Sequence, residues 1–138
     1  MSIGIPDLWP AEVAFTDVVS PLMILRHQAG LLRDRSQNVL EAVVTSHVGE
    51  VDVVHEFSIV VPALARKSYS MFRVTHQFDQ VYPAGIQFGP MTSDRFEFFS
   101  NQEAFTRFLA EVFRHPRTVS VIQSQLAQIN ERTALDPV

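Results

Sequence analysis

The chain has 138 residues, of which 46% are hydrophobic and 19% are charged, the composition of one ordinary globular domain. Its net charge of −4 at pH 7 argues against proteins that bind nucleic acid by neutralising phosphates, since these need clustered lysine and arginine. The absence of cysteine excludes disulfides, thiolate metal sites and a cysteine nucleophile.

The sequence contains no targeting or membrane signal. No apolar run approaches the roughly 18 residues that a membrane helix needs. No basic residue precedes Arg26, and no long apolar run opens the chain, so a secretory signal is not predicted. We therefore expect a single cytoplasmic domain over residues 1–138, with no membrane partner.

Residues 1–19 are predicted to form an extended arm, with a short strand near Val13 to Phe15, because no apolar period is sustained there. Pro10 keeps Trp9 out of helical geometry. A lone tryptophan usually packs as an anchor, so we expect Trp9 to pin the arm to the body. The alternative is that Trp9 is an exposed contact residue for a partner.

Ser20 and Pro21 predict the start of a helix that runs to about Gln37, because serine caps free amide groups and proline suits the first helical position. Gly30, at its middle, either allows a close approach to a sheet or marks a bend. The apolar side comprises Leu22, Leu25, Ala29 and Leu32, widened by Ile24, Gln28 and Leu31; Arg26, Arg33 and Arg35 are expected to be solvated, the alternative being an anion site.

Residues 38–61 are predicted to form the hairpin on which the sheet is built. Two apolar runs alternate with the period of a strand and are separated by Gly49 and Glu50. With these two as turn residues, both apolar sets fall on one face. The expected pairs are Val44 with His55, Ala42 with Phe57, and Leu40 with Ile59.

Three further strands are expected after Pro62 and a loop over residues 63–68 that carries Arg66 and Lys67. The third strand spans Tyr69 to Gln77, and the fourth contains Ala84, Ile86 and Phe88. The fifth lies within Thr92 to Phe99, at the sheet edge, with Phe96 and Phe98 on one side and Glu97 and Phe99 on the other.

Two helices are predicted to close the chain. Ser100 and Glu103 have the spacing of a capping box, and the apolar residues that follow match a helical face until His115 and Pro116. A last helix from about Thr118 to Glu131 shows a narrow apolar stripe, and residues 133–138 are expected to be frayed. The predicted fold is therefore α+β: an N-terminal helix, an antiparallel sheet of about five strands in meander order, and two C-terminal helices packed on one face.

No contiguous phosphate-loop, zinc or hydrolase motif is present, so we expect no cofactor and no metal. His47, Asp52, His55 and Glu56 surround the hairpin turn, and two imidazoles with carboxylates could bind a metal ion. Neighbours in a strand alternate between faces, however, so the four cannot converge. We expect instead that His47 and Asp52 form an exposed cross-strand pair.

His76, Asp79 and Tyr82 flank a turn and are the catalytic candidates if the chain is an enzyme, with a carboxylate orienting an acid/base histidine. The simpler interpretation is that His76 is half buried and hydrogen-bonded to backbone, because it shares a strand face with Phe72 and Val74. A phenylalanine set is expected to fill the core, the alternative being an apolar ligand pocket. It comprises Phe96, Phe98, Phe99, Phe105, Phe108 and Phe113.

The expected function is that of a small binding protein without catalytic activity, docking a protein partner in an immunity-, inhibitor- or chaperone-like role typical of small acidic bacterial domains. The alternative is a small enzyme or ligand-binding domain with a pocket near His76. A homodimer through the last helix or the edge strand is also open. The expected binding residues are Trp9, Arg66, Lys67, Ile122 and Leu126.

Overall fold

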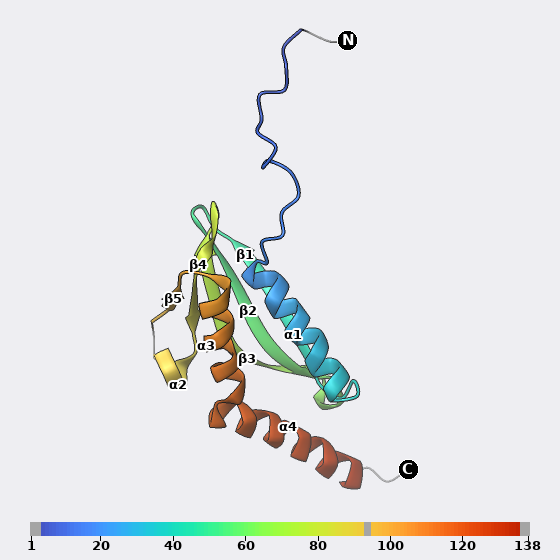
Figure 1. Ribbon diagram of the computed structural model, residues 1–138. Helices are drawn as coiled ribbons and strands as arrows, with labels where there is room; N and C mark the ends of the chain where they lie inside the picture. Colours follow the sequence, from blue (N-terminus) through green and yellow to red (C-terminus); the bar gives the residue numbers. More distant parts are fainter. Residues whose placement is uncertain (1–3, 93–94, 136–138) are drawn as a thin grey trace.

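The computed structural model describes residues 4–92 and 95–135. A five-stranded antiparallel sheet runs in the order β1-β2-β3-β4-β5, preceded by one helix and followed by two (Figure 1). The predicted α+β meander is therefore confirmed. The elements are α1 (Pro21–Arg35), β1 (Glu41–Val48), β2 (Asp52–Val61), the 3-10 turn η1 (Pro62–Leu64), β3 (Lys67–Gln77), β4 (Gln80–Gln87), α2 (Gly89–Thr92), β5 (Glu97–Phe99), α3 (Gln102–Arg114) and α4 (Pro116–Leu135).

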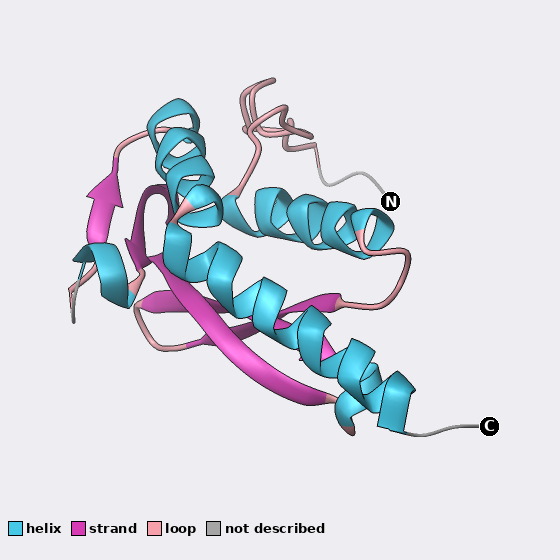
Figure 2. Ribbon diagram, turned by 90° about the horizontal axis from the view of Figure 1, so that it is seen from below, coloured by secondary structure: helices cyan, strands magenta, loops and turns pink. Residues whose placement is uncertain are grey.

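The helices α1, α3 and α4 lie on the same face of the sheet (Figure 2). The core forms beneath α1 and α3, where Leu25, Phe105 and Val112 are fully buried. Phe57 and Phe72 stack on adjacent strands with ring centroids 5.0 Å apart, and Phe113 packs against both. The sheet is therefore covered by helices from both ends of the chain.

The register of the β1–β2 hairpin differs from the predicted one by two residues. Val44 lies opposite Phe57 and Ala42 lies opposite Ile59. The cause is the turn: the Gly49 amide donates to the Asp52 carbonyl at 2.8 Å, which makes Glu50 and Val51 the turn residues. Because a shift of two preserves the side-chain period, the apolar sets still share the face that was expected.

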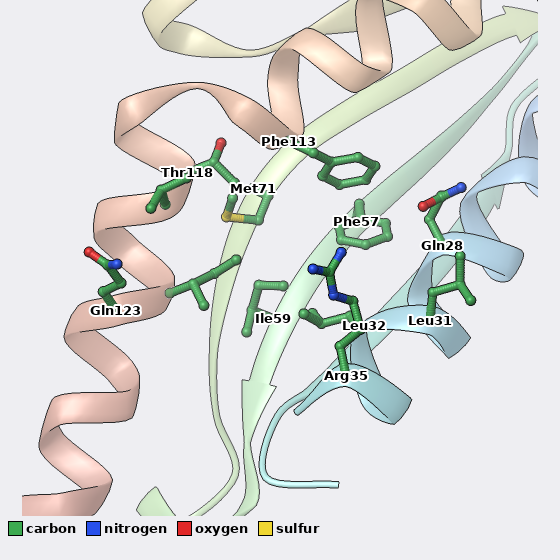
Figure 3. Close-up of a pocket in the computed structure, with 12 residues that line it drawn as sticks. Gln28, Leu31, Leu32, Arg35, Phe57, Ile59, Met71, Phe113, Thr118 and Gln123 are labelled. Carbon is green, nitrogen blue, oxygen red and sulfur yellow. The ribbon is translucent and has the colours of Figure 1, made fainter. Parts of the chain in front are cut away.

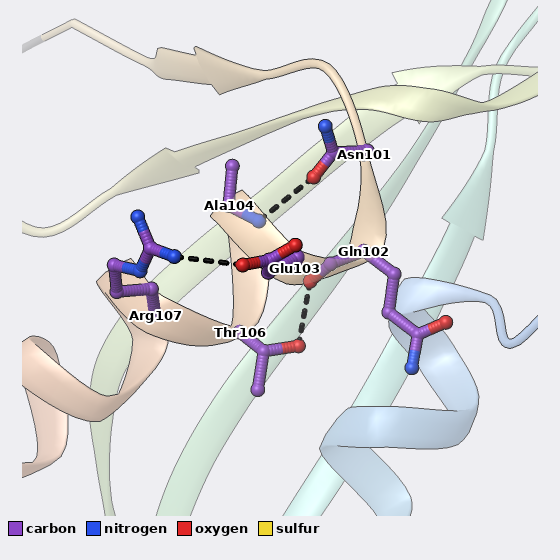
Figure 4. A network of polar contacts seen from close by, with 6 residues as sticks. All are labelled: Asn101, Gln102, Glu103, Ala104, Thr106 and Arg107. Carbon is purple, nitrogen blue, oxygen red and sulfur yellow. Dashed lines mark hydrogen bonds and ion pairs between the residues drawn. The ribbon is translucent and has the colours of Figure 1, made fainter.

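The start of α3 also differs from the prediction. Asn101, not Ser100, is the N-cap, and its side chain accepts a hydrogen bond from the Ala104 amide at 2.9 Å (Figure 4). Glu103 does not complete a capping box; its carboxylate pairs with Arg107 one turn later, at 2.8 Å. The capping residue is thus displaced by one position along the chain.

The ends of the other helices follow local chemistry. Ser20 caps α1 as predicted, accepting from the Met23 amide at 3.3 Å. The helix ends at Arg35, before Gln37, because Gln37 and Asn38 take positive φ values of 54° and 67°. A β-carbon on Gly30 would have no atom within 4 Å, so this glycine is not needed for a close approach to the sheet.

The fourth and fifth strands divide the phenylalanine set between two faces. Phe99 packs against Phe108 toward the helices, with centroids 4.7 Å apart. Phe96 and Phe98 lie against Gly85 on the other face, and Phe98 remains 58% exposed. The expectation that all six phenylalanines fill the core is therefore wrong for Phe96 and Phe98.

The last helix is longer than predicted. It begins at Pro116, and the Thr118 hydroxyl donates to the Val112 carbonyl at 2.6 Å across the α3–α4 bend. Residues 133–135, which were expected to belong to a frayed tail, are the last residues of α4, while residues 136–138 lie outside the described residues. None of the described helices combines the length and apolar character that a membrane crossing needs.

The described part of the N-terminal arm, residues 4–19, contains no helix or strand, so the strand expected near Val13 to Phe15 is absent. In Figure 1 the arm leads away from the sheet, starting from the first turn of α1. Trp9 is 74% exposed, and the expectation that it pins the arm to the body is wrong.

Candidate functional site

An open groove of about 610 Å³ lies between α1 and α4, over the middle of the sheet (Figure 3). The floor is Phe57, Ile59 and Met71 from β2 and β3, with Phe113 at the end of α3. The two walls are helical. They comprise Gln28, Leu31, Leu32 and Arg35 from α1, and Thr118, Val119, Ile122 and Gln123 from α4.

The groove exists because α4 bends away at Pro116 and does not close against α1. Phe57 and Ile59 are two residues apart on β2 and therefore lie on the same, helix-covered face. Where Phe57 pairs with Phe72 and Ser58 with Ser70, a bulge leaves Met71 of β3 unpaired and places it on that face too. Leu31 and Val119, on opposite walls, remain 40% and 41% exposed. The apolar side chains that reach solvent along this channel are therefore those of its helical walls, while the floor residues Phe57, Ile59 and Met71 stay buried beneath them.

Arg35 is the only ionisable residue among the described side chains that line the groove. Its side chain extends from the last turn of α1 across the groove (Figure 3). It makes no ion pair with any described residue, whereas Arg66, Arg73 and Arg107 each pair with a glutamate. The groove therefore presents an apolar floor with one free positive charge at its edge.

The expected binding residues are distributed over several surfaces. Ile122 lines the groove, and Leu126 packs partly buried against the core one turn further along α4. Arg66 pairs with Glu41 at 3.2 Å. Lys67 lines a separate cavity of about 380 Å³ on another side of α4, so only Ile122 belongs to the groove.

The arm is the other unusual surface, because its large apolar side chains are exposed. Its hydrogen bonds are local: the Trp9 amide donates to the Asp7 carboxylate and the Val18 amide to the Thr16 hydroxyl. The link to the body comes at its end, where the Tyr82 hydroxyl donates to the Val19 carbonyl at 2.9 Å. Within the part of the arm that the structure describes, this bond joins its end to the body, and the large apolar side chains before it stay exposed.

A buried histidine pair lies on the same face of the sheet as the core. His55 on β2 and His76 on β3 are 2% and 8% exposed, and their Nε2 atoms are 3.0 Å apart. His76 Nδ1 lies 2.8 Å from the Gln77 carbonyl, and His55 Nδ1 lies 2.7 Å from the Ser46 hydroxyl. A chain of three hydrogen bonds thus crosses from β1 to the end of β3.

The tautomers of this pair follow from its ends. The Gln77 carbonyl only accepts, so His76 Nδ1 carries a proton; where that is the only proton on the ring, His76 Nε2 accepts from His55 Nε2. His55 Nδ1 then accepts from the Ser46 hydroxyl. Burial, with smaller contributions from His76 and Arg26, lowers the pKa of His55 to about 4. His55 is therefore neutral at neutral pH.

The proposed catalytic trio does not assemble as an acid/base site. His76 is hydrogen-bonded to the Gln77 backbone carbonyl, as the simpler interpretation expected. Its second hydrogen bond, to His55, was not expected. The Tyr82 hydroxyl points to Val19, and burial raises its pKa. Asp79 is exposed in the turn between β3 and β4.

The residues around the first hairpin turn also stay apart. His47 lies opposite Val54 and Asp52 opposite Gln77, so the expected His47–Asp52 pair does not form. Glu56 pairs with Arg73 at 3.2 Å. Among the described residues, no group of three or more histidines and carboxylates is arranged to hold a metal ion.

Comparisons with models of protein families, with curated proteins and with solved structures find no match to this chain.

Proposed function

We propose that this chain is a binding protein that docks an apolar, acidic segment of a partner protein in the groove between α1 and α4. The observation that carries the proposal is the open apolar channel with one unpaired arginine. Burial of partner side chains against the wall residues Leu31, Val119 and Ile122 would supply the affinity, and Arg35 would favour a carboxylate beside them. Such docking suits an immunity-, inhibitor- or chaperone-like role.

The chemistry of the lining favours a binding role over a catalytic one. The groove walls and floor offer leucine, isoleucine, valine, phenylalanine and methionine, with amide and hydroxyl groups at the edges. Apolar grooves between helices with a polar rim are a recurring way to receive a peptide segment. Methionine in the floor adapts its shape to different side chains.

The proposal predicts which peptides the protein selects. In selection from a random peptide library displayed on phage, we expect enriched peptides to combine aromatic or aliphatic residues with aspartate or glutamate. Leu31→Glu should weaken their binding by about tenfold or more, because it places a charge against the apolar floor. Arg35→Glu should weaken it too, through loss of the charge match.

Two control variants lie on the same helix. Met23→Glu alters an α1 residue that is 57% exposed and does not line the groove, and Arg33→Glu reverses an exposed charge two residues before Arg35 that does not line it either. Both should leave peptide binding unchanged. If no peptides are enriched, or if the enriched peptides bind Leu31→Glu as well as the original chain, the groove is not the docking site.

A further inference from the structure

The arm exposes more large apolar surface than any other stretch of comparable length among the described residues. Phe15 is fully exposed, Leu8 is 81% exposed and Trp9 is 74% exposed. Ile5, Val13 and Val18 are each more than half exposed. A short segment with this many exposed large apolar side chains is a candidate for contact with a partner surface.

The chemistry of the arm complements that of the groove. Residues 4–19 carry Asp7, Glu12 and Asp17 and no basic residue. The groove offers an apolar floor and the unpaired Arg35. The arm is thus an apolar, acidic segment of the kind that the groove is suited to receive.

We propose that the occupant of the groove is the arm of a second copy of this chain, so that two copies exchange arms. This proposal rests on the function proposed above and names the partner. The arm leaves α1 at its N-terminal end, where Tyr82 holds Val19, while the groove follows residues 28–35 at the other end of the helix. The arm leads away from its own groove (Figure 1).

Exchange between two copies satisfies both surfaces at once. In a two-fold dimer each copy gives one arm and offers one groove, and the assembly closes without leaving either exposed. Trp9 and Phe15 each bury roughly 150–250 Å² when enclosed. Counted for two arms, with the groove surface that they cover, this comes to about 900–1,300 Å², near the lower limit of about 1,200 Å² for specific interfaces.

Light scattering on the full chain tests the exchange. We expect a mass of two chains, and a mass of one chain for the double variant Trp9→Ser with Phe15→Ser, whose sites are exposed and do not support the fold. Leu31→Glu, in the groove, should also give one chain. Phe78→Ser, which removes a 70% exposed phenylalanine at the β3–β4 turn, should remain a dimer.

Mixing the variants identifies the contact. The arm variant keeps an intact groove and Leu31→Glu keeps an intact arm, so a mixture of the two monomers should form a dimer joined by a single arm. If the mixture stays monomeric, or if the arm variant alone is a dimer, arm exchange is wrong.

A labelled peptide of residues 4–19 separates this proposal from the one on which it rests. We expect it to bind the arm variant and to bind Leu31→Glu at least about tenfold more weakly. A chain that is monomeric at all concentrations but whose groove binds this peptide overturns the exchange and leaves the groove as a docking site. No binding of this peptide, together with failed peptide selection, overturns both.

Discussion

Burial of His55 links the stability of the fold to pH. Its pKa is about 4 in the folded chain and 6.5 in the unfolded one, so below pH 6.5 the unfolded state binds a proton that the folded state does not. The free energy of unfolding is therefore expected to fall between pH 6.5 and 4, by up to about 3 kcal/mol from this residue. Urea denaturation at a series of pH values measures this fall.

Two variants test the assignment to His55. His55→Gln should make the free energy of unfolding depend less on pH in this range, and His47→Gln, at an exposed site on the same hairpin, should leave the dependence unchanged. Equal slopes in the two variants would contradict the assignment.

The sequence predicts that both histidines of the pair lie on the buried face of the sheet, but not that they touch. His55 alternates with Phe57 and Ile59, and His76 with Phe72 and Val74, so both belong to the buried faces of consecutive strands. In the structure His55 pairs with Val74 and His76 with Val53, which makes the two imidazoles diagonal neighbours. To predict that contact, one must know the register in which β2 and β3 pair. The alternation in the sequence shows which face a side chain is on, but it does not show which residue lies opposite on the next strand.

The start of α3 offers a test at the level of an element. Asn101→Ala removes the side chain that accepts from the Ala104 amide, and we expect it to lower the free energy of unfolding by about 1 kcal/mol. Ser100→Ala is the matched control, expected to change stability by less than about 0.5 kcal/mol, because Ser100 makes no side-chain hydrogen bond to the described residues. If Ser100→Ala lowered the free energy of unfolding more than Asn101→Ala does, the N-cap would be Ser100, as predicted from the sequence.

Elements with strong periodicity were predicted well, and their ends were not. The spacing of Phe105, Phe108 and Val112 defined α3, and all three are buried. The β1–β2 turn lies one residue later than predicted because the Gly49 amide bonds to the Asp52 carbonyl. This position depends on backbone geometry, which the pattern of side chains does not show.

The groove is a property of the assembled molecule. Its lining comes from α1, β2, β3, α3 and α4, and only Ile122 was expected to bind a partner. Arg35 was considered only as part of a solvated face or an anion site. No local pattern reports that α4 bends away from α1 and leaves Leu31 and Val119 exposed on facing walls, since this depends on how distant segments pack.

Trp9 is the only tryptophan in the chain and lies in the arm, so its fluorescence reports directly on whether the arm is docked. We predict that its emission shifts to shorter wavelength as the protein concentration rises, because the indole leaves water for the groove of a second copy. The same titration of Leu31→Glu should keep the emission of an exposed indole. An exposed emission at every concentration of the original chain would contradict the account.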